Sequence, residues 1–528
     1  MKHTDIIRKL NLEQKCALLS GETVFTTRAL PGKGIPSITL SDGPNGVRKQ
    51  AGAADHLGLN PSVPATCFPT SSATACSWDE ALGEAVGEAM GEEAAAQEVA
   101  VLLGPGLNIQ RSPLCGRDFE YFSEDPILAG KMAAAYVRGI QKNGISACPK
   151  HFAVNSQELR RMASDSVVDE RTLRELYLTG FEIVVKEARP KTIMTSYNLI
   201  NGTYANENAH LLQDILRKDW GFDGAVVTDW GGSNDHALGV KNGSTLEMPC
   251  PGGDSIRELM KAVKDGKVTE ADLDVRLDEL LELVLSTHAA VEKAPRTFDA
   301  AAHHALARRA AAESIVLLKN EDGILPLKAG EKLAVIGDFA QTPRYQGAGS
   351  SAVNALQVDA LLDCIKADDS GISFVGYASG FDRQGAADPK KQEEAVSLAK
   401  QADTVLLCLG LDELRESEGL DRADMALAEN QQQLLDAVAA VNPNVVVLLS
   451  AGAPVETPWV GRCKALVYGA LGGQAGAGAA ADILTGKLCP CGKLSQTWAK
   501  AHDDTPAKAN FGGEGRNVEY REGLYVGY

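Results

Sequence analysis

Short apolar runs alternate with longer helical stretches through residues 1–290, and this alternation restricts the possible folds more than any other feature. The runs are Ser37–Leu40, Val99–Leu103, Ile145–Cys148, Thr192–Thr195, Ala225–Val227 and Thr245–Met248. Short apolar runs separated by helices are typical of parallel strands joined by crossover connections. The pattern therefore predicts an α/β fold built on parallel strands.

A polar or ionisable residue accompanies the end of each run. In chain order these residues are Asp42, Asn108, Lys150-His151, Ser196-Tyr197, Asp229-Trp230 and Glu247. Any one of them could simply cap the next helix, but six successive cases favour a shared site. In a (β/α)8 barrel the loops at the carboxyl ends of the strands build the active site. We therefore expect an N-terminal TIM-like barrel of the (β/α)8 type.

The clearest helix between two runs is Ser77–Glu98. Ser77 and Glu80 form an S-x-x-E sequence, which predicts a capping box at the start of the helix. Apolar residues then recur at every fourth position, as Leu82, Val86, Met90 and Ala94.

A second alternation follows a connector. The connector contains a helix at Ala300–Ser314. The expected strands after it are Leu333–Ile336, Thr404–Leu409, Val445–Leu449 and Ala465–Tyr468, with helices at Gln392–Lys400, Asp424–Val441 and Gln474–Leu484 between them. This order is typical of an open, mainly parallel α/β sandwich. We expect a barrel domain at residues 1–292, a linker at 293–325 and a sandwich domain at 326–528.

Composition excludes several function classes. The chain has 528 residues, with 52 basic and 70 acidic side chains, so its net charge of −18 disfavours a nucleic-acid partner. No apolar run approaches the ~20 residues that span a membrane, and the first ten residues lack the apolar core of a secretory signal. The eleven cysteines are scattered and odd in number, which favours reduced thiols in a cytoplasmic protein. Cys489-Pro490-Cys491 has a poor spacing for zinc.

The glycine-rich stretch Gly472–Gly478 satisfies the loose dinucleotide fingerprint, as Gly476-x-Gly478-x-x-Ala481. That fingerprint also needs a following strand with an acidic residue, and here the chain continues into Gly486–Gly492 without one. We interpret the glycines as helix–sheet packing and expect no cofactor.

Asp229 is the main candidate for chemistry. A carboxylate at a strand end beside an aromatic ring and flexible glycines can be a nucleophile, a general base or a metal ligand. The neighbouring loops supply the cations Arg48, Arg117, Lys150 and Arg161. Positive charge favours the ionised carboxylate that a nucleophile requires and opposes a metal, so we expect no metal site.

A second carboxylate has to come from another part of the chain. The charged run Glu413–Arg422 follows the expected strand Thr404–Leu409, and such a run is usually a solvated loop. It nevertheless lies where α/β sheets present ligand-binding residues. If the loop reaches the barrel mouth, one of its glutamates can face Asp229.

At these residues the chain resembles family 3 glycoside hydrolases of the β-glucosidase type. The matching motifs are Ser41–Arg48, Gly104–Arg111, Gly116–Pro126, Lys150–Asn155, Asp169–Leu173, Thr195–Asn198, Val227–Gly231, Ser417–Arg422 and Gly472–Gly476. So many ordered motifs along almost the whole chain make the resemblance highly specific.

The resemblance implies the role of each site residue. Asp229 would be the nucleophile and Glu418 the acid/base, with Glu416 as a weaker candidate for the acid. Trp230 would form an apolar wall and Ser350 would approach from the second domain. The residues expected to hold the sugar hydroxyls are Asp42, Arg48, Arg117, Lys150, His151, Arg161 and Tyr197.

The implied function is a retaining β-glucosidase that removes terminal β-D-glucosyl residues from oligosaccharides or from aryl and alkyl glucosides. Asp229 would form a covalent glycosyl intermediate, and Glu418 would keep its proton through burial and the nearby Asp229 charge. The substrate is the expected partner, and homo-oligomer formation is compatible with the sequence.

Three alternatives stay open. The first is a β-xylosidase or another exo-glycosidase of the same family, although a pentose lacks the CH₂OH arm expected beside Asp42. The resemblance also disfavours the N-acetylglucosaminidase branch of the family, which uses a histidine–aspartate pair shortly after the K-H-F motif, because no histidine follows Phe152 before His210 here. The second is a carbohydrate-binding relative without hydrolysis, and the third, remote one is an NAD-dependent oxidoreductase. In similar enzymes the stretch Tyr520–Tyr528 leads into further strands and usually a fibronectin-type domain, so we expect that domain to be absent and the sandwich truncated.

Overall fold

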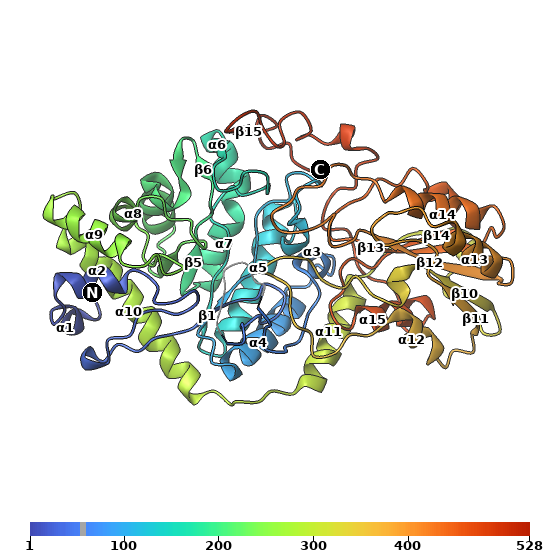
Figure 1. The fold of residues 1–528 in the computed structure, drawn as a ribbon, viewed down its shortest axis with the longest axis horizontal. Coiled ribbons are helices and arrows are strands. Elements are labelled where there is room, and N and C mark those ends of the chain that lie inside the picture. The colour runs from blue at the N-terminus through green and yellow to red at the C-terminus, as the bar shows by residue number, and fades with distance from the viewer. Residues whose placement is uncertain (53–59) are drawn as a thin grey trace.

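Two α/β bodies lie side by side in the computed structural model, which describes residues 1–52 and 60–528 (Figure 1). The first body holds the N-terminal half, drawn in blue and green. The second holds most of the remaining chain, drawn in yellow to red, and a long segment returns from it to the first body.

The strands of the first body are short, buried and mostly parallel. β1 (Leu40–Asp42), β2 (Val101–Leu103) and β3 (Ser146–Ala147) form one parallel sheet, while β5 (Thr192–Met194) and β8 (Ala225–Val227) form another. The predicted parallel α/β organisation is thus confirmed for the first five apolar runs. The sixth run, Thr245–Met248, makes only single bridges, Leu246 with Val227 and Glu247 with Ser20.

These sheets do not by themselves establish a barrel. Among the described residues, a single bridge between Phe152 and Thr195 connects the two sheets, and no sheet contains eight strands. A further sheet has the order β15-β4-β6-β7, with bounds Asn517–Glu519, Asp165–Val167, Leu199–Ile200 and Thr203–Tyr204. The (β/α)8 arrangement stays a prediction.

Helices pack on the outside of these strands. They include α4 (Glu80–Ala96), α5 (Pro126–Gln141), α7 (Thr179–Ala188) and α10 (Glu270–Lys293). The predicted capping box at the start of α4 is wrong, because Asp79 is the N-cap and accepts from the Ala81 and Leu82 amides. Ser77 lies one turn earlier, and its hydroxyl donates to the Thr74 carbonyl.

The second body is built on one six-stranded sheet of order β11-β10-β12-β13-β14-β9. The bounds are β9 Val316–Asn320, β10 Lys332–Ile336, β11 Ser373–Ala378, β12 Thr404–Gly410, β13 Val445–Ser450 and β14 Ala465–Tyr468. All neighbours are parallel except β9, which pairs antiparallel with β14. The predicted open, mainly parallel sheet is confirmed, but β9 lies inside the segment expected to be a linker.

The helices of the second body cover both faces of its sheet. They are α11 (Ala300–Ser314), α12 (Leu361–Lys366), α13 (Pro389–Ala399), α14 (Glu429–Ala439) and α15 (Gly476–Leu484). The predicted bounds of α11 agree with the structure. The glycine-rich stretch begins α15, where an added Cβ at Gly472 would lie 2.9 Å from the Gly476 Cα. This close approach agrees with the packing role predicted for these glycines.

The segment after Trp498 returns to the first body. β15 extends the sheet of β4 in parallel, and Arg111 binds the Glu522 carboxylate and the Glu519 carbonyl. The Arg111 guanidinium also lies 3.7 Å from the centre of the Tyr520 ring. The last residues are therefore an integral part of the first body's packing.

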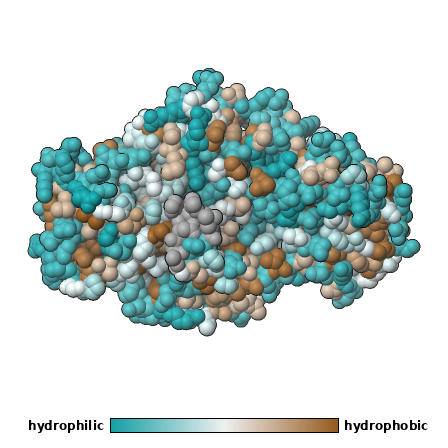
Figure 2. Space-filling model, in the orientation of Figure 1, coloured by the Kyte–Doolittle hydropathy of each residue, from teal (hydrophilic) through white to brown (hydrophobic). Residues whose placement is uncertain are grey.

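The visible face of the surface (Figure 2) agrees with a chain of average polarity. Figure 2 shows a face that is mainly hydrophilic, with small hydrophobic areas between the polar residues. Within the described ranges, no helix is long and apolar enough to cross a membrane.

Candidate active site

Asp229 lies two residues beyond the last residue of β8, at the carboxyl end of the strand. Its Oδ1 accepts a hydrogen bond from the Trp230 amide at 2.8 Å, and its Oδ2 lies 3.7 Å from His151 Nε2. Oδ2 is buried and has no hydrogen-bond partner among the described residues. The site therefore offers one carboxylate oxygen that is held in place and one that is available for a reaction.

Burial and nearby cations act in opposite directions on Asp229. Burial raises the pKa of this carboxyl group above its ordinary value, and the charges of Arg161, Arg117 and Lys150 oppose the rise. The three cations thus compensate part of the cost of an ionised Asp229.

The cations themselves are held by a residue that sequence reasoning missed. Glu120 is fully buried and accepts two hydrogen bonds from the Arg117 guanidinium, at 2.9 and 2.8 Å. Lys150 Nζ lies 3.5 Å from the same carboxylate. Glu120 therefore fixes two of the predicted sugar-binding cations, and only its position in the motif Gly116–Pro126 could have drawn attention to it.

His151 is a neutral hydrogen-bonding group. Its amide donates to Asn108 Oδ1 at 2.8 Å, and its ring nitrogens lie 3.3 Å from Tyr121 Oη and from Arg117 Nη2. Burial and the Arg117 charge hold the pKa of His151 well below its usual range. Asn108, another of the strand-end residues, thus positions His151.

Glu418 reaches the first body from the second. Its Oε1 lies 2.9 Å from Arg161 Nη1 and 3.7 Å from Arg117 Nη1. Its Oε2 accepts from the Ser350 amide at 2.7 Å and from the Ser350 hydroxyl at 2.5 Å. Glu418 therefore meets two cations of the first body, and Ser350 holds its other oxygen.

The proton expected on Glu418 is not favoured in this arrangement. Burial alone would raise the pKa of Glu418, but the Arg117 and Arg161 charges and the Ser350 hydrogen bonds lower it below the usual range. The expectation that burial and Asp229 dominate is wrong here, because both oxygens of Glu418 already bind donors.

Aromatic residues line another side of the site. The Arg161 guanidinium lies 5.1 Å from the centre of the Tyr197 ring, and the Tyr197 hydroxyl donates to the Trp230 carbonyl at 2.9 Å. The Trp230 indole donates to the Val24 carbonyl at 2.7 Å, and its ring centre lies 5.3 Å from that of Phe25. Trp230 is half-buried and can present an apolar face.

Asp42 and Arg48 complete the predicted set. Asp42 ends β1, and its carbonyl accepts from the Arg48 amide at 2.9 Å. Burial raises the pKa of Asp42 to about 6, and Lys150, Arg48, Asp229 and Glu418 all act on its charge. Asp42 therefore belongs to the same charged cluster as both candidate catalytic groups.

Two other glutamates lie elsewhere. Glu416 is buried and accepts from the Gly452 amide at 3.0 Å, so it fills a packing role in the second body. Glu247 accepts from the Ser20 and Ser255 hydroxyls, at 3.2 and 3.1 Å. Across the described ranges, no three His, Cys, Asp or Glu side chains are arranged to hold a metal ion.

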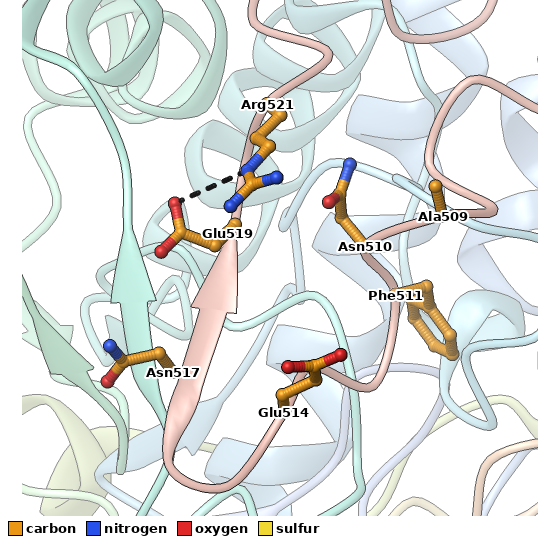
Figure 3. Close-up of a pocket in the computed structure, with 8 residues that line it drawn as sticks. Ala509, Asn510, Phe511, Glu514, Asn517, Glu519 and Arg521 are labelled. Atoms are coloured by element: carbon orange, nitrogen blue, oxygen red, sulfur yellow. Dashed lines mark ion pairs between the residues drawn. The ribbon is translucent and has the colours of Figure 1, made fainter.

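Two surface cavities differ in whether a residue of the cluster around Asp229 lines them. One cavity of about 500 Å³ is lined by Arg48 and by residues 343–349, which precede Ser350. Another, of about 390 Å³, lies beside β15, where Phe511, Glu514 and Arg521 are among the lining side chains (Figure 3). None of the residues that line this second cavity belongs to the cluster around Asp229.

Two family models match the chain. The Glycosyl hydrolase family 3 N terminal domain matches residues 53–283, and the Glycosyl hydrolase family 3 C-terminal domain matches residues 315–528. The chain belongs to glycosyl hydrolase family 3. The resemblance seen in the motifs is confirmed, and the chain is a glycoside hydrolase. The second body carries the C-terminal domain of family 3.

Several similar proteins match almost the entire chain. A thermostable beta-glucosidase B from Acetivibrio thermocellus is 46% identical over 526 residues, which are 99% of this chain and 69% of that protein. An exo-alpha-(1->6)-L-arabinopyranosidase from Bifidobacterium breve is 45% identical over 534 residues, 99% of this chain and 70% of that protein.

Solved family 3 structures have the same fold. A beta-glucosidase from Bifidobacterium adolescentis superposes with a TM-score of 0.93 at 44% identity, over 99% of this chain and 75% of that one. Beta-glucosidase 3B from Thermotoga neapolitana, in complex with glucose, gives 0.91 at 33% identity, over 100% of this chain and 80% of that one.

Proposed function

We propose that the chain is a retaining β-glucosidase that removes terminal β-D-glucosyl residues. The observation that carries this proposal is the pair of Asp229, with a buried oxygen that has no partner among the described residues, and Glu418, brought to the same cations from the second body. A retaining glycosidase needs two carboxyl groups ~5–5.5 Å apart, one as nucleophile and one as acid. The 46% identical beta-glucosidase supports the choice of glucose.

The proposed reaction proceeds in two steps. Asp229 Oδ2 attacks the anomeric carbon while Glu418 gives a proton to the leaving oxygen, and a covalent glycosyl-aspartate forms. Glu418 then removes a proton from water, which attacks the same carbon and releases the sugar. His151, neutral and held by Asn108, is suited to bind a sugar hydroxyl, as are Arg117 and Lys150.

The ion pair between Glu418 and Arg161 has to change during this cycle. A carboxylate that binds two cations and two Ser350 donors is a poor acid. We infer that the sugar takes over Arg161 as a hydroxyl-binding donor, which weakens the pair and lets Glu418 gain its proton.

The proposal also includes the architecture of the first body, the domain limits and the cellular location. We infer that the parallel strands of the first body form a (β/α)8-type barrel, with domain limits near residues 292 and 325. A cytoplasmic location is supported by the eleven cysteines, which are all free thiols.

A second candidate function is exo-arabinopyranosidase activity. The relative from Bifidobacterium breve is 45% identical over nearly the entire chain, almost the same identity as the beta-glucosidase. A pentopyranose lacks the CH₂OH arm, so Asp42 would have one hydroxyl fewer to bind. Hydrolysis of p-nitrophenyl α-L-arabinopyranoside, compared with the β-D-glucoside, separates the two functions.

The test is release of p-nitrophenol from the β-D-glucoside by wild type, Asp229→Ala and Glu418→Ala. We expect both variants to lose at least about 10²-fold in kcat, because Asp229 forms the covalent intermediate and Glu418 is the base that activates the water that hydrolyses it. Azide should rescue Asp229→Ala with formation of the α-glucosyl azide, and Glu418→Ala with formation of the β-glucosyl azide.

Glu413→Gln is the matched control, since Glu413 lies in the same charged run but pairs with Arg383 at 3.0 Å instead of the site cations. It should keep wild-type activity. Full activity in either Ala variant, or an inert but folded wild type, would contradict the proposed function.

A further inference from the structure

Two loops from different bodies hold each other next to Glu418. Glu158 Oε2 accepts from the Gly419 amide at 2.8 Å. In return, the Asp421 carboxylate accepts from the Glu158 amide at 3.0 and 3.1 Å and from the Leu159 amide at 2.8 Å. We call these four residues, Glu158, Leu159, Gly419 and Asp421, the clasp.

Within the clasp the Glu158 side chain is shielded from water, whereas Leu159 and Gly419 are exposed. Glu158 is 3% exposed, so its hydrogen bonds and charge act in a low-dielectric surrounding, where they are stronger than at a surface. Asp421 also accepts from the Gly116 amide at 3.1 Å, directly before Arg117. The clasp thus ties the loop that carries Glu418 to the segment that carries a site cation.

Glu158 and Glu418 share one donor. Arg161 Nη1 lies 2.8 Å from Glu158 Oε2 and 2.9 Å from Glu418 Oε1. The positive charge of Arg161 is therefore divided between two carboxylates. Loss of either carboxylate would leave Arg161 entirely to the other.

Residues of both bodies surround Glu158 and Glu418. The charged and titratable groups that face Glu158 or Glu418 include Arg117, Arg161, Asp42, Asp421, Tyr121, Tyr197 and Cys115, and the hydroxyl of Ser350 binds Glu418. Burial raises the pKa of Glu158 to about 7, against the Arg117 and Arg161 charges. Glu158 and Glu418 therefore titrate as a coupled pair.

We propose that Glu158 is a positioning residue for Glu418, which holds the backbone of its loop through Gly419 and competes with it for Arg161. This inference rests on the proposed acid role of Glu418. With Glu158 in place, Arg161 has an alternative partner when the leaving group approaches, so Glu418 can take up its proton. Without that partner, Arg161 would hold Glu418 as a carboxylate.

The test variant is Glu158→Gln, which keeps an oxygen for Gly419 but removes the charge. Because the full Arg161 charge then acts on Glu418, the pKa of Glu418 falls. The alkaline limb of kcat/KM, which requires protonated Glu418, should shift down by about one pH unit. At neutral pH, kcat/KM should fall about tenfold on an alkyl β-glucoside, which needs the acid, and less than about twofold on the 2,4-dinitrophenyl β-glucoside, whose leaving group does not.

Glu124→Gln is the matched control. Glu124 is also a buried carboxylate of the first body, but it binds Thr497 through the amide at 2.8 Å and the hydroxyl at 2.6 Å. The alkaline limb of kcat/KM for Glu124→Gln should coincide with that of wild type. An unmoved limb in Glu158→Gln, or an equal loss on both substrates, would mean that Glu158 is only structural and would overturn the inference.

Failure of the proposed function has a different signature. Activity retained by Glu418→Ala would refute the acid role itself, whereas an inactive Glu418→Ala with an unaffected Glu158→Gln would refute only the clasp inference. If Glu158→Gln does not fold, Glu158→Asp withdraws the carboxylate by one methylene and takes its place. A smaller shift in the same direction would support the inference, and an unmoved limb would overturn it.

Discussion

Buried carboxylates organise the site at the scale of single residues, and each of them serves several partners. Glu120 holds Arg117 through two hydrogen bonds and approaches Lys150, while Glu158 holds Arg161 and the Gly419 amide. The cations that remain available for a sugar are therefore fixed in orientation before the substrate arrives. Such preorganisation is a main source of catalytic power in electrostatic sites.

Replacement of Glu120 by glutamine tests this arrangement. The variant leaves the Arg117 charge buried without its bidentate partner, so we expect a loss of about 3–5 kcal/mol in the free energy of unfolding. Urea denaturation measures it. Glu187→Gln, which breaks an exposed pair with Lys131, should leave the free energy of unfolding almost unchanged. Equal costs for the two variants would show that Glu120 is not a structural anchor.

The strands that the sequence predicted well are those that are buried on both faces of the sheet. β12 and β13 are continuous apolar runs, and their predicted bounds differ from the observed ones by a residue at most. β11 and β9 were missed, because both are only partly buried edge strands and β9 ends in the polar Lys319-Asn320. Short strand-end motifs predicted which residues would gather, but Glu158 and Asp421 act through partners that lie 261 and 263 residues away, a distance that no local pattern reveals.

Helix α11 is joined to α4 by a titratable contact. His303 lies 2.7 Å from Glu93 and 3.2 Å from Glu92, and its ring is stacked on Phe298. Burial alone would lower the pKa of His303, but the hydrogen bond and charge of Glu93, with the charge of Glu92, raise it above 6.5. Protonated His303 therefore stabilises the folded state.

The sign of the pH dependence follows from that shift. A raised pKa in the folded state gives a stabilisation that is complete below the unfolded value and is lost as the pH rises through the folded value. The difference in Tm between wild type and His303→Gln should thus be largest near about pH 6 and shrink toward about pH 9. A difference that does not vary with pH would mean that His303 is neutral throughout.

At the scale of the whole molecule, function depends on the contact between the two bodies. The Glu418 loop lies on the first body so closely that a Cβ added to Gly116 would overlap the Leu420 carbonyl oxygen and lie 2.5 Å from that of Ser417. The Gly116 backbone does not lie in the left-handed region, so it is the space and not the conformation that requires glycine here.

Gly116→Ala should therefore displace the loop while both bodies remain folded. A displacement of about 1 Å in a catalytic group can cost on the order of 10²-fold in rate, and we expect a loss of that size in kcat/KM for an alkyl β-glucoside. Gly461→Ala is the control, because its Cβ would meet no described atom within 4 Å. Unchanged activity in Gly116→Ala would show that the loop tolerates the shift.

The return of the last segment to the first body has a consequence for modularity. Because β15 extends the sheet of β4 and Arg111 binds Glu522, the polypeptide leaves the first body, builds the second and comes back. A chimera with a single crossover near residue 300 therefore cannot exchange one body without also replacing a part of the other. A chimera that takes the second body from a relative has to retain the native residues 499–528 or import their partners around Arg111 as well. Recombination within such a family should therefore favour paired crossovers.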